Sequence, residues 1–243
     1  MTGSKLLLSQ KAIDPRDRLI LALDVPSVED AKALVERLGD AVSFYKIGLE
    51  LFMTGSYFEL LAWLTERGKK VFVDLKFFDV PQTVASAVRQ LHGRGATFAT
   101  VHGNDAILRA ASEAKGDTKI LAVTVLTSLD RGDLDALGFR TDVRTLVLSR
   151  AKRALEIGCD GVISSGMEAE SLRQELGDRF IIVVPGIRPV ENKPADDQKR
   201  TVDVEEALEK GADYIVVGRP IRQAPDPRAA AEDIQRRIAA LFG

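Results

Sequence analysis

Eight short apolar runs are spaced along the chain, and an amphipathic stretch separates each run from the next. The runs are nearly continuous in apolar residues rather than alternating between apolar and polar, which is typical of parallel strands covered on both faces. We therefore predict eight parallel strands, at residues 19–23, 42–47, 71–76, 97–101, 120–125, 161–163, 180–184 and 214–217.

The stretches between the runs carry signals for the start of helices. Ser27 with Asp30, and Asp203 with Glu206, have the spacing of a capping box. Pro81 fits the first turn of a helix, where the missing N–H group costs nothing. Strand and helix are therefore predicted to alternate eight times along the chain.

No linker, charge block or low-complexity tract interrupts this alternation, and a length of 243 residues suits one barrel domain. We predict an α/β protein, with a single-domain (β/α)8 TIM barrel over residues 18–243. Residues 1–17 lack the pattern and are predicted to form an N-terminal extension. A doubly wound open sheet is the alternative fold.

Charge and composition narrow the possible functions. The net charge of -2 and the pI near 5.8 lack the basic bias of a nucleic-acid groove. No run approaches the ~20 apolar residues of a membrane span or, near the N-terminus, the roughly 7–15 of a signal-peptide core. Cys159 is the only cysteine, which argues against a disulfide framework and a thiolate metal cluster. We expect a cytoplasmic protein with no nucleic-acid or membrane partner.

Charged residues lie at the C-terminal ends of the first three predicted strands, where β/α barrels hold their active sites. They are Asp24, Lys46, Asp74 and Lys76. Because side chains alternate along a strand, Asp74 and Lys76 point away from the apolar Leu75, and we expect both charges to face the barrel axis. Two carboxylates and two ammonium groups in alternation keep one another ionised at neutral pH. A purely structural ion-pair network is the alternative.

Asp79 has two interpretations. Its spacing adds it to the charged cluster of the third strand. It also stands just before the helix predicted at Pro81, where the helix dipole favours a carboxylate. A role at the helix start would not exclude a role in catalysis.

The ends of the last two predicted strands suit an anion. Gly218, Arg219 and a proline follow the eighth strand, and β/α barrels commonly bind phosphate at helix starts after strands seven and eight. Arg188 follows the seventh strand and opens the polar connection 188–201, a predicted lid that also carries Gln198. A solvated surface charge is the alternative for each arginine alone. Together, at neighbouring strand ends, they indicate a phosphate site.

The third strand and the loop after it match a known pattern. Asp74-x-Lys76-x-x-Asp79, followed by Val80-Pro81-Gln82-Thr83, resembles the signature of the orotidine 5'-monophosphate decarboxylase family. A wider superfamily of barrels shares that string, and the full set of matches is far more specific. The further matches are Leu23-Asp24, Lys46-Ile47-Gly48, Leu126-Thr127-Ser128, Pro185-Gly186-Ile187-Arg188, Asp196-Asp197-Gln198 and Val217-Gly218-Arg219. Val80 and Gln82 depart from the family's more frequent Ile and Asn, and neither has a predicted chemical role.

The resemblance implies conversion of orotidine 5'-monophosphate to uridine 5'-monophosphate in de novo pyrimidine biosynthesis, with no metal and no other cofactor. It implies that Lys76 is the general acid that protonates C6 after carbon dioxide leaves. It also implies that Asp74 lies beside the departing carboxylate. Asp24 and Lys46 would bind the ribose hydroxyls and complete the charged network.

The resemblance further implies a homodimer with shared active sites, in which Asp79 and Thr83 project into the partner's site. Thr127 would touch the pyrimidine. A last group would hold the phosphate beneath the predicted lid, namely Arg188, Gln198, Gly218 and Arg219.

Two other functions stay open. Magnesium-dependent lyases of the keto-gulonate phosphate decarboxylase or hexulose phosphate synthase type resemble this chain at Asp-x-Lys-x-x-Asp, but they have a metal-binding glutamate on the second strand, where this chain has Lys46. The other alternative is a barrel that binds a phosphorylated metabolite without catalysis. Each predicted catalytic position holds a chemically competent residue, which favours an enzyme: Lys46, Asp74, Lys76 and Asp79.

Overall fold

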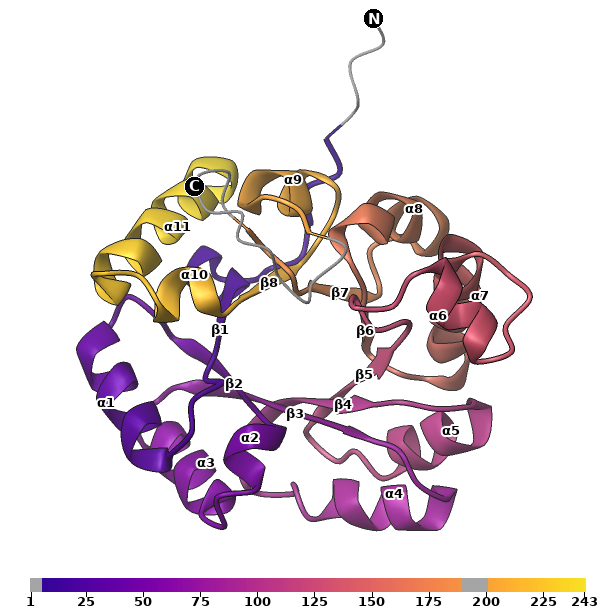
Figure 1. Cartoon of the computed structure of the whole chain (residues 1–243), viewed down its shortest axis with the longest axis horizontal. Helices are drawn as coiled ribbons and strands as arrows, with labels where there is room; N and C mark the ends of the chain where they lie inside the picture. The colour runs from indigo at the N-terminus through magenta and orange to yellow at the C-terminus, as the bar shows by residue number, and fades with distance from the viewer. Residues whose placement is uncertain (1–5, 189–200) are drawn as a thin grey trace, which may run out of the picture.

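The predicted barrel is present. The structure, a computed structural model, describes residues 6–188 and 201–243. Eight parallel strands close into a ring in chain order, and helices surround the ring (Figure 1). The ring closes because β8 pairs with β1, with Leu19 opposite Ile215, which excludes the open sheet. The strands are β1 Leu19–Ala22, β2 Phe44–Gly48, β3 Lys70–Phe77, β4 Ala96–Val101, β5 Lys119–Val123, β6 Gly161–Ile163, β7 Ile181–Val184 and β8 Tyr214–Val217.

The helices begin near the predicted signals. Ser27 caps its helix by accepting from the N–H of Asp30, and Pro81 occupies a first turn. Asp203 also caps a helix, although its carboxylate accepts from the N–H of Val204 rather than from the third residue of a capping box. The helices are η1 Pro15–Arg18, α1 Val28–Leu38, α2 Leu49–Phe52, α3 Tyr57–Glu66, α4 Pro81–Arg89, α5 Asp105–Glu113, α6 Arg131–Ala136, α7 Val143–Ile157, α8 Gly166–Leu176, α9 Val204–Glu209, α10 Arg219–Arg222 and α11 Pro227–Phe242.

Alternation along the strands separates two apolar layers. One set of side chains packs outward against the helices, and a second set fills the inside of the ring. Within the ring, the aromatic rings of Phe44, Phe98 and Tyr214 lie with centroids 5.2 to 5.9 Å apart. These side chains fill the interior of the barrel. The next inward-facing positions along each strand therefore form the floor of any cavity at the C-terminal end of the barrel.

The segment before the barrel packs on its opposite end. The N–H of Leu7 donates to the carbonyl of Glu209 over 2.8 Å. Ser9 and Lys11 both bond the carboxylate of Asp213, which directly precedes β8. In the described part of the chain, no helix combines the length and the apolar character that crossing a membrane requires.

Candidate active site

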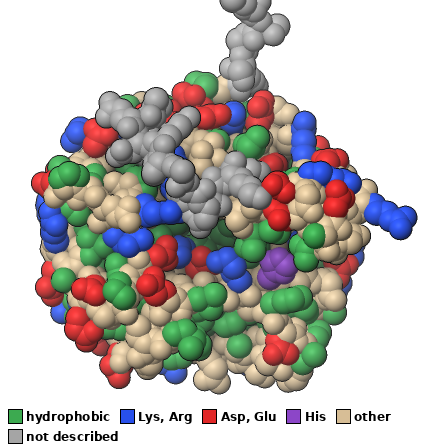
Figure 2. Space-filling view, viewed as in Figure 1, with side chains coloured by type: hydrophobic (Ala, Val, Ile, Leu, Met, Phe, Trp, Pro, Cys, Tyr) green, Lys and Arg blue, Asp and Glu red, His purple; other side chains and the backbone are tan. Residues whose placement is uncertain are grey.

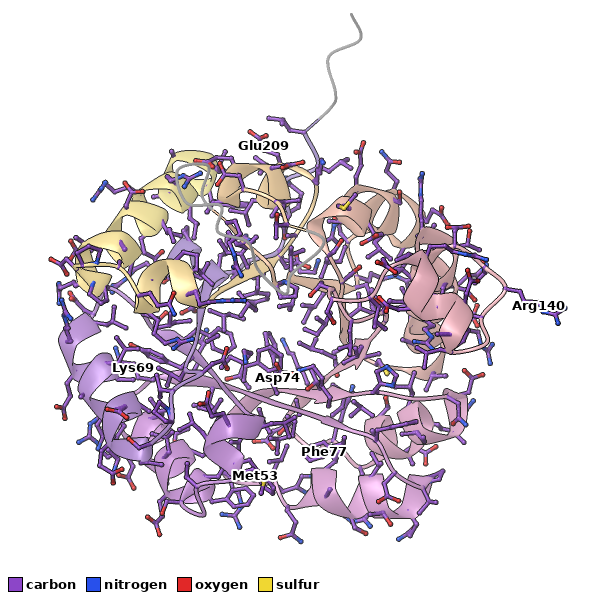
Figure 3. All side chains as sticks on the ribbon, in the orientation of Figure 1. Met53, Lys69, Asp74, Phe77, Arg140 and Glu209 are labelled. Carbon is purple, nitrogen blue, oxygen red and sulfur yellow. The ribbon has the colours of Figure 1, made fainter. Side chains whose placement is uncertain are left out.

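A cavity of about 260 Å³ opens at the C-terminal ends of the strands. Figure 2 shows acidic and basic side chains side by side in the hollow at the centre of this face, and Figure 3 places Asp74 within the ring. Eight of the residues predicted for the site line this one cavity: Asp24, Lys46, Asp74, Lys76, Thr127, Arg188, Gly218 and Arg219. They come from six different strand ends, which only barrel closure brings together.

Two ammonium groups and two carboxylates form a chain on the cavity floor. Lys46 Nζ lies 3.0 Å from Asp24 Oδ1 and 3.4 Å from Asp74 Oδ2. Lys76 Nζ lies 2.9 Å from Asp74 Oδ1. The side chain of Lys46 is 12% exposed and that of Lys76 34%, so Lys76 is the cation with room to meet a ligand.

Mutual pairing keeps the buried members of this chain charged. Burial alone would raise the pKa of Asp74, but Lys46, Lys76 and a hydrogen bond from Thr100 outweigh it and lower that pKa. Burial alone would lower the pKa of Lys46, and Asp74 and Asp24 outweigh it, so that pKa is raised. Asp74 and Lys46 are therefore both charged across the neutral range.

Lys76 reaches its inward position by a route that simple alternation does not describe. Its backbone lies in the left-handed region, with φ of 47°, and it is the one residue other than glycine with positive φ in the described ranges. A non-glycine residue held there costs about 1–3 kcal/mol, a cost often found at functional sites. The β3–β4 register is also interrupted between Val73 and Phe77. The expected direction of Lys76 is observed, but the expected regular strand geometry is wrong at this residue.

Thr100 is a site residue that the sequence reasoning missed. Its hydroxyl donates to Asp74 Oδ1 over 2.8 Å and accepts from the N–H of Lys76 over 3.0 Å. Counting inward positions along the fourth strand from Phe98 would have placed Thr100 at the same level as Asp74. Threonine is common in strands, however, so its presence alone carries no signal of a site.

The phosphate candidates occupy the far side of the cavity from Lys76. Gly218 directly follows β8, and Arg219 begins the short helix α10. Arg188 is buried, and one of its guanidinium nitrogens donates to the carbonyl of Ile187 over 2.8 Å. Gln198, and most of the predicted lid, lie outside the described residues.

Asp79 and Thr83 do not line the cavity of their own chain. Both are exposed, beyond the end of β3. Asp79 Oδ1 accepts from the N–H of Val80 over 2.6 Å, directly before α4. Val80 is the N-cap of α4, and no side chain caps this helix, so the Asp79 carboxylate lies just before the helix start and is open to solvent.

Metal-binding geometry is not found among residues 6–188 and 201–243: no three or more His, Cys, Asp or Glu side chains are grouped to hold an ion there. His102 directly follows β4 and is not among the residues that line this cavity. Burial first, and then Arg150 and Lys76, lower its pKa. A neutral imidazole beside Phe78, whose ring lies 5.3 Å away, fits a packing role.

Comparison with known proteins gives a consistent result. Residues 17–234 match the profile of the family described as "Orotidine 5'-phosphate decarboxylase / HUMPS family". A protein of Methylococcus capsulatus named orotidine 5'-phosphate decarboxylase is 65% identical over 235 residues, which is 97% of each chain. A protein of that name from Xanthomonas euvesicatoria is 55% identical over 228 residues, 93% of each chain.

Solved structures agree with these matches. The crystal structure of orotidine 5'-phosphate decarboxylase from Lactobacillus acidophilus has a TM-score of 0.81 at 37% identity, covering 91% of this chain and 99% of that one. The enzyme of that name from Pyrococcus horikoshii has a TM-score of 0.72 at 30% identity, covering 91% and 99%. The similarity thus extends over nearly the full length of both chains.

Proposed function

This chain belongs to the orotidine 5'-phosphate decarboxylase / HUMPS family, and from that premise we propose that it converts orotidine 5'-monophosphate to uridine 5'-monophosphate and carbon dioxide. The reaction is a step of pyrimidine biosynthesis, carried out by a carboxy-lyase. The observation that carries the proposal is the alternating chain of Asp24, Lys46, Asp74 and Lys76 on the cavity floor.

The chemistry requires a fixed positive charge near the reacting carbon. When the bond between C6 and the carboxylate breaks, its electron pair stays on C6 in the plane of the ring and cannot delocalise into the π system. The barrier without an enzyme is therefore very high, and the enzyme must lower it by an amount near the upper end of about 8–23 kcal/mol. An ammonium group that is already oriented stabilises this charge without rearranging solvent.

Lys76 fits that role better than Lys46. Lys46 bonds two carboxylates and is largely covered, whereas Lys76 bonds one and is one-third exposed to the cavity. In the proposed step the ammonium of Lys76 gives its proton to C6, and the neutral amine then regains one from solvent. Asp74 holds the ammonium and lies beside the substrate's carboxylate.

The remaining lining residues suit the rest of the nucleotide. We assign Asp24 and Lys46 to the ribose hydroxyls and Thr127 to the pyrimidine. We assign the phosphate to the side of the cavity that is lined by Arg188, Arg219 and the backbone of Gly218. Binding of this remote group supplies free energy that helps to exclude water from the reacting atoms.

Lys46 also distinguishes this chemistry from that of the magnesium-dependent lyases. Its ammonium lies 3.0 Å from Asp24 and 3.4 Å from Asp74, where it would repel a divalent cation. We therefore assign no metal and no other cofactor to the reaction. A binding barrel without catalysis is less well supported, because relatives that are 65% and 55% identical over nearly the whole chain are named as decarboxylases.

We propose a homodimer, and the exposed apolar surface of this chain supports it. Phe78 and Val80, which flank Asp79 in the sequence, are exposed by 67% and 62%, and three apolar side chains of α2 and the residue after it are exposed by 43 to 80%: Leu49, Phe52 and Met53. In Figure 2 hydrophobic side chains gather between the central hollow and the lower edge, over α2. A second copy would cover this surface and receive Asp79 and Thr83 in its own site.

The single free thiol, Cys159, suits a cytoplasmic location.

The test is a direct assay of the purified chain. With orotidine 5'-monophosphate, we expect loss of substrate absorbance and the appearance of equal amounts of uridine 5'-monophosphate and carbon dioxide, with full activity in EDTA. A requirement for magnesium would favour the rival lyases, and no turnover would overturn the proposal.

Shared sites are tested by mixing two inactive variants, Lys76→Ala and Asp79→Ala. Hybrid dimers carry one intact site, so an equimolar mixture recovers about a quarter of wild-type activity if the site is shared. No recovery, with subunit exchange demonstrated by mass-tagged chains, would show that each site is built from one chain.

A further inference from the structure

The third and fourth strands lose their regular pairing at the level of the cavity floor. Val73 lies opposite Ala99, and Phe77 lies opposite Val101. Between these pairs β3 has three residues, 74 to 76, and β4 has only Thr100. β3 therefore bulges toward the cavity by two extra residues, and the bulge carries both Asp74 and Lys76.

The Thr100 side chain closes this bulge. It is fully buried, and its one hydroxyl proton goes to Asp74 Oδ1 over 2.8 Å. A lone pair of the same oxygen accepts the N–H of Lys76 over 3.0 Å. Because Lys76 Nζ donates to the same Asp74 oxygen over 2.9 Å, the three residues form a closed ring of hydrogen bonds.

The ring holds a backbone that would otherwise relax. Lys76 has φ of 47°, a conformation that a lysine keeps only where its surroundings enforce it. The N–H of Lys76 lacks a partner in a regular ladder at this point, and the Thr100 hydroxyl takes the place of the missing carbonyl. Regular pairing resumes one residue later, where the N–H of His102 donates to the carbonyl of Phe77 over 3.0 Å.

We propose that Thr100 is a positioning residue for decarboxylation: its hydroxyl fixes the Asp74 carboxylate and the bulged Lys76 backbone together, so that the lysine ammonium is aimed into the cavity. This inference rests on the proposed function and deepens it. Thr100 touches no reacting atom. It acts through the two residues that do.

The electrostatics of Asp74 give the proposal a measurable consequence. The ionisable groups that face this carboxylate are Lys46 from β2, Lys76 from β3 and Tyr57 from α3, with Asp24 behind Lys46. The hydrogen bond from β4 is one of the contacts that lower its pKa. Removing that bond moves the pKa of Asp74 upward.

The variants separate the hydroxyl from the rest of the side chain. Thr100→Val keeps the shape of the side chain and loses the hydroxyl. Thr100→Ser keeps the hydroxyl and loses the methyl group. Thr100→Ala differs from Thr100→Ser only in lacking the hydroxyl. Thr118→Val is the control, because Thr118 is equally buried, lies outside the cavity, and its hydroxyl has no hydrogen-bond partner among the residues the structure describes.

We expect kcat of Thr100→Val and Thr100→Ala to fall about 10- to 100-fold while KM changes less than about threefold, as for an interaction that matters in the transition state. The acid limb of kcat, and the titration of the Asp74 carboxyl followed by NMR, should both move to higher pH. Thr100→Ser should stay within about fivefold of wild type, and Thr118→Val should match it.

Each other outcome has a definite meaning. If Thr100→Val keeps kcat and the Asp74 titration of wild type, the proposal is wrong. It is also wrong if Ser and Ala variants are equally impaired, because the methyl group would then be the important part. If Thr100→Val does not fold, the comparison of Thr100→Ser with Thr100→Ala tests the proposal by itself. Absence of turnover in the wild type would remove the proposed function, while the NMR titration still reads the hydroxyl's effect on Asp74.

Discussion

The two ends of the barrel each bury an aspartate between cations, but they leave these groups in different situations. At the N-terminal end Asp213 is fully buried and accepts from Ser9, Lys11 Nζ at 2.9 Å, Arg173 Nη2 at 2.8 Å and the N–H of Ile182 at 2.8 Å. We call these residues the basal cluster. At the C-terminal end, the charged chain of the active site borders an open cavity.

The two ends differ in how much of the hydrogen-bonding capacity of their charged side chains is left unused within the chain. In the basal cluster Arg173 also donates to the carbonyls of Gly177, Phe180 and Gly211, so its guanidinium is satisfied by its own chain. In the active site the side chains of Asp24 and Lys76 remain 46% and 34% exposed. Similar charged groups therefore stabilise the fold at one end and are available to a ligand at the other.

The largest effect that tests this contrast is expected for Lys76→Ala. By the proposed mechanism, this change removes both the proton donor and the fixed charge at C6, so kcat should fall by at least about 10⁴-fold. The free energy of unfolding should change by no more than about 1 kcal/mol, because the ion pair is partly exposed. Lys70→Ala is the matched control, since Lys70 lies at the other end of the same strand and pairs with Asp17.

If Lys70→Ala lowered kcat as much as Lys76→Ala, the proposed difference between the two ends of the barrel would be contradicted. So would a Lys76→Ala enzyme whose kcat lies within tenfold of wild type in stopped-flow and steady-state assays.

Asp213→Ala should have the opposite consequence. It leaves the buried Arg173 without its carboxylate, and breaking such a pair costs about 3–5 kcal/mol of unfolding free energy. Urea denaturation at pH 7 measures this loss, and kcat of the folded fraction should stay unchanged. Asp178→Ala is the control, because Asp178 is 59% exposed and lies 3.6 Å from the same arginine. It should cost less than about 1 kcal/mol. Equal losses from the two variants would count against the basal cluster as described.

Arg219→Ala tests the ligand side of the active site with a smaller effect. Losing the proposed charged contact to the phosphate should lower kcat/KM for orotidine 5'-monophosphate about 100-fold, and added guanidinium should partly restore it. The phosphate-free nucleoside provides the control, and its kcat/KM should not change. An equal fall for the nucleoside would mean that Arg219 acts on something other than the phosphate.

The fold could be predicted well because its signals are local. Strands covered on both faces must be apolar, and all eight runs became strands. Their ends differ from the prediction by at most two residues: the run at 42–47 became Phe44–Gly48, and that at 120–125 became Lys119–Val123. Strand ends depend on where a neighbouring strand still offers a partner, which is a property of the pair rather than of either segment.

The site could be predicted only in part for the same reason. Asp24, Lys46, Asp74 and Lys76 are conspicuous because charges at strand ends are costly unless they are used. Thr100 is ordinary for a strand, and its importance comes from the β3–β4 register. The basal cluster was missed because nothing local marks Asp213 as buried among the 36 acidic residues of the chain.

The smallest expected effect concerns Lys11 at one end of the barrel and Lys46 at the other. Their contributions to the free energy of unfolding should change with pH in opposite directions. Burial outweighs the attraction of Asp213 and lowers the pKa of Lys11, so the unfolded chain holds this proton more tightly than the folded one. Lys11 therefore contributes a stability that rises as pH increases toward 10.5. The pKa of Lys46 is instead raised, because its carboxylate partners outweigh burial, so its contribution is complete below pH 10.5 and falls as pH rises through the folded value.

Urea unfolding of wild type, Lys11→Met and Lys46→Met between pH 7 and 11 measures both slopes. At pH 7, Lys11→Met should lie within about 1 kcal/mol of wild type, since the pair also carries a desolvation cost. The stability difference between wild type and Lys11→Met should grow with pH, and the difference between wild type and Lys46→Met should shrink. If both differences had the same slope, the two ends would treat their lysines alike, and unused capacity would not be what distinguishes the active site.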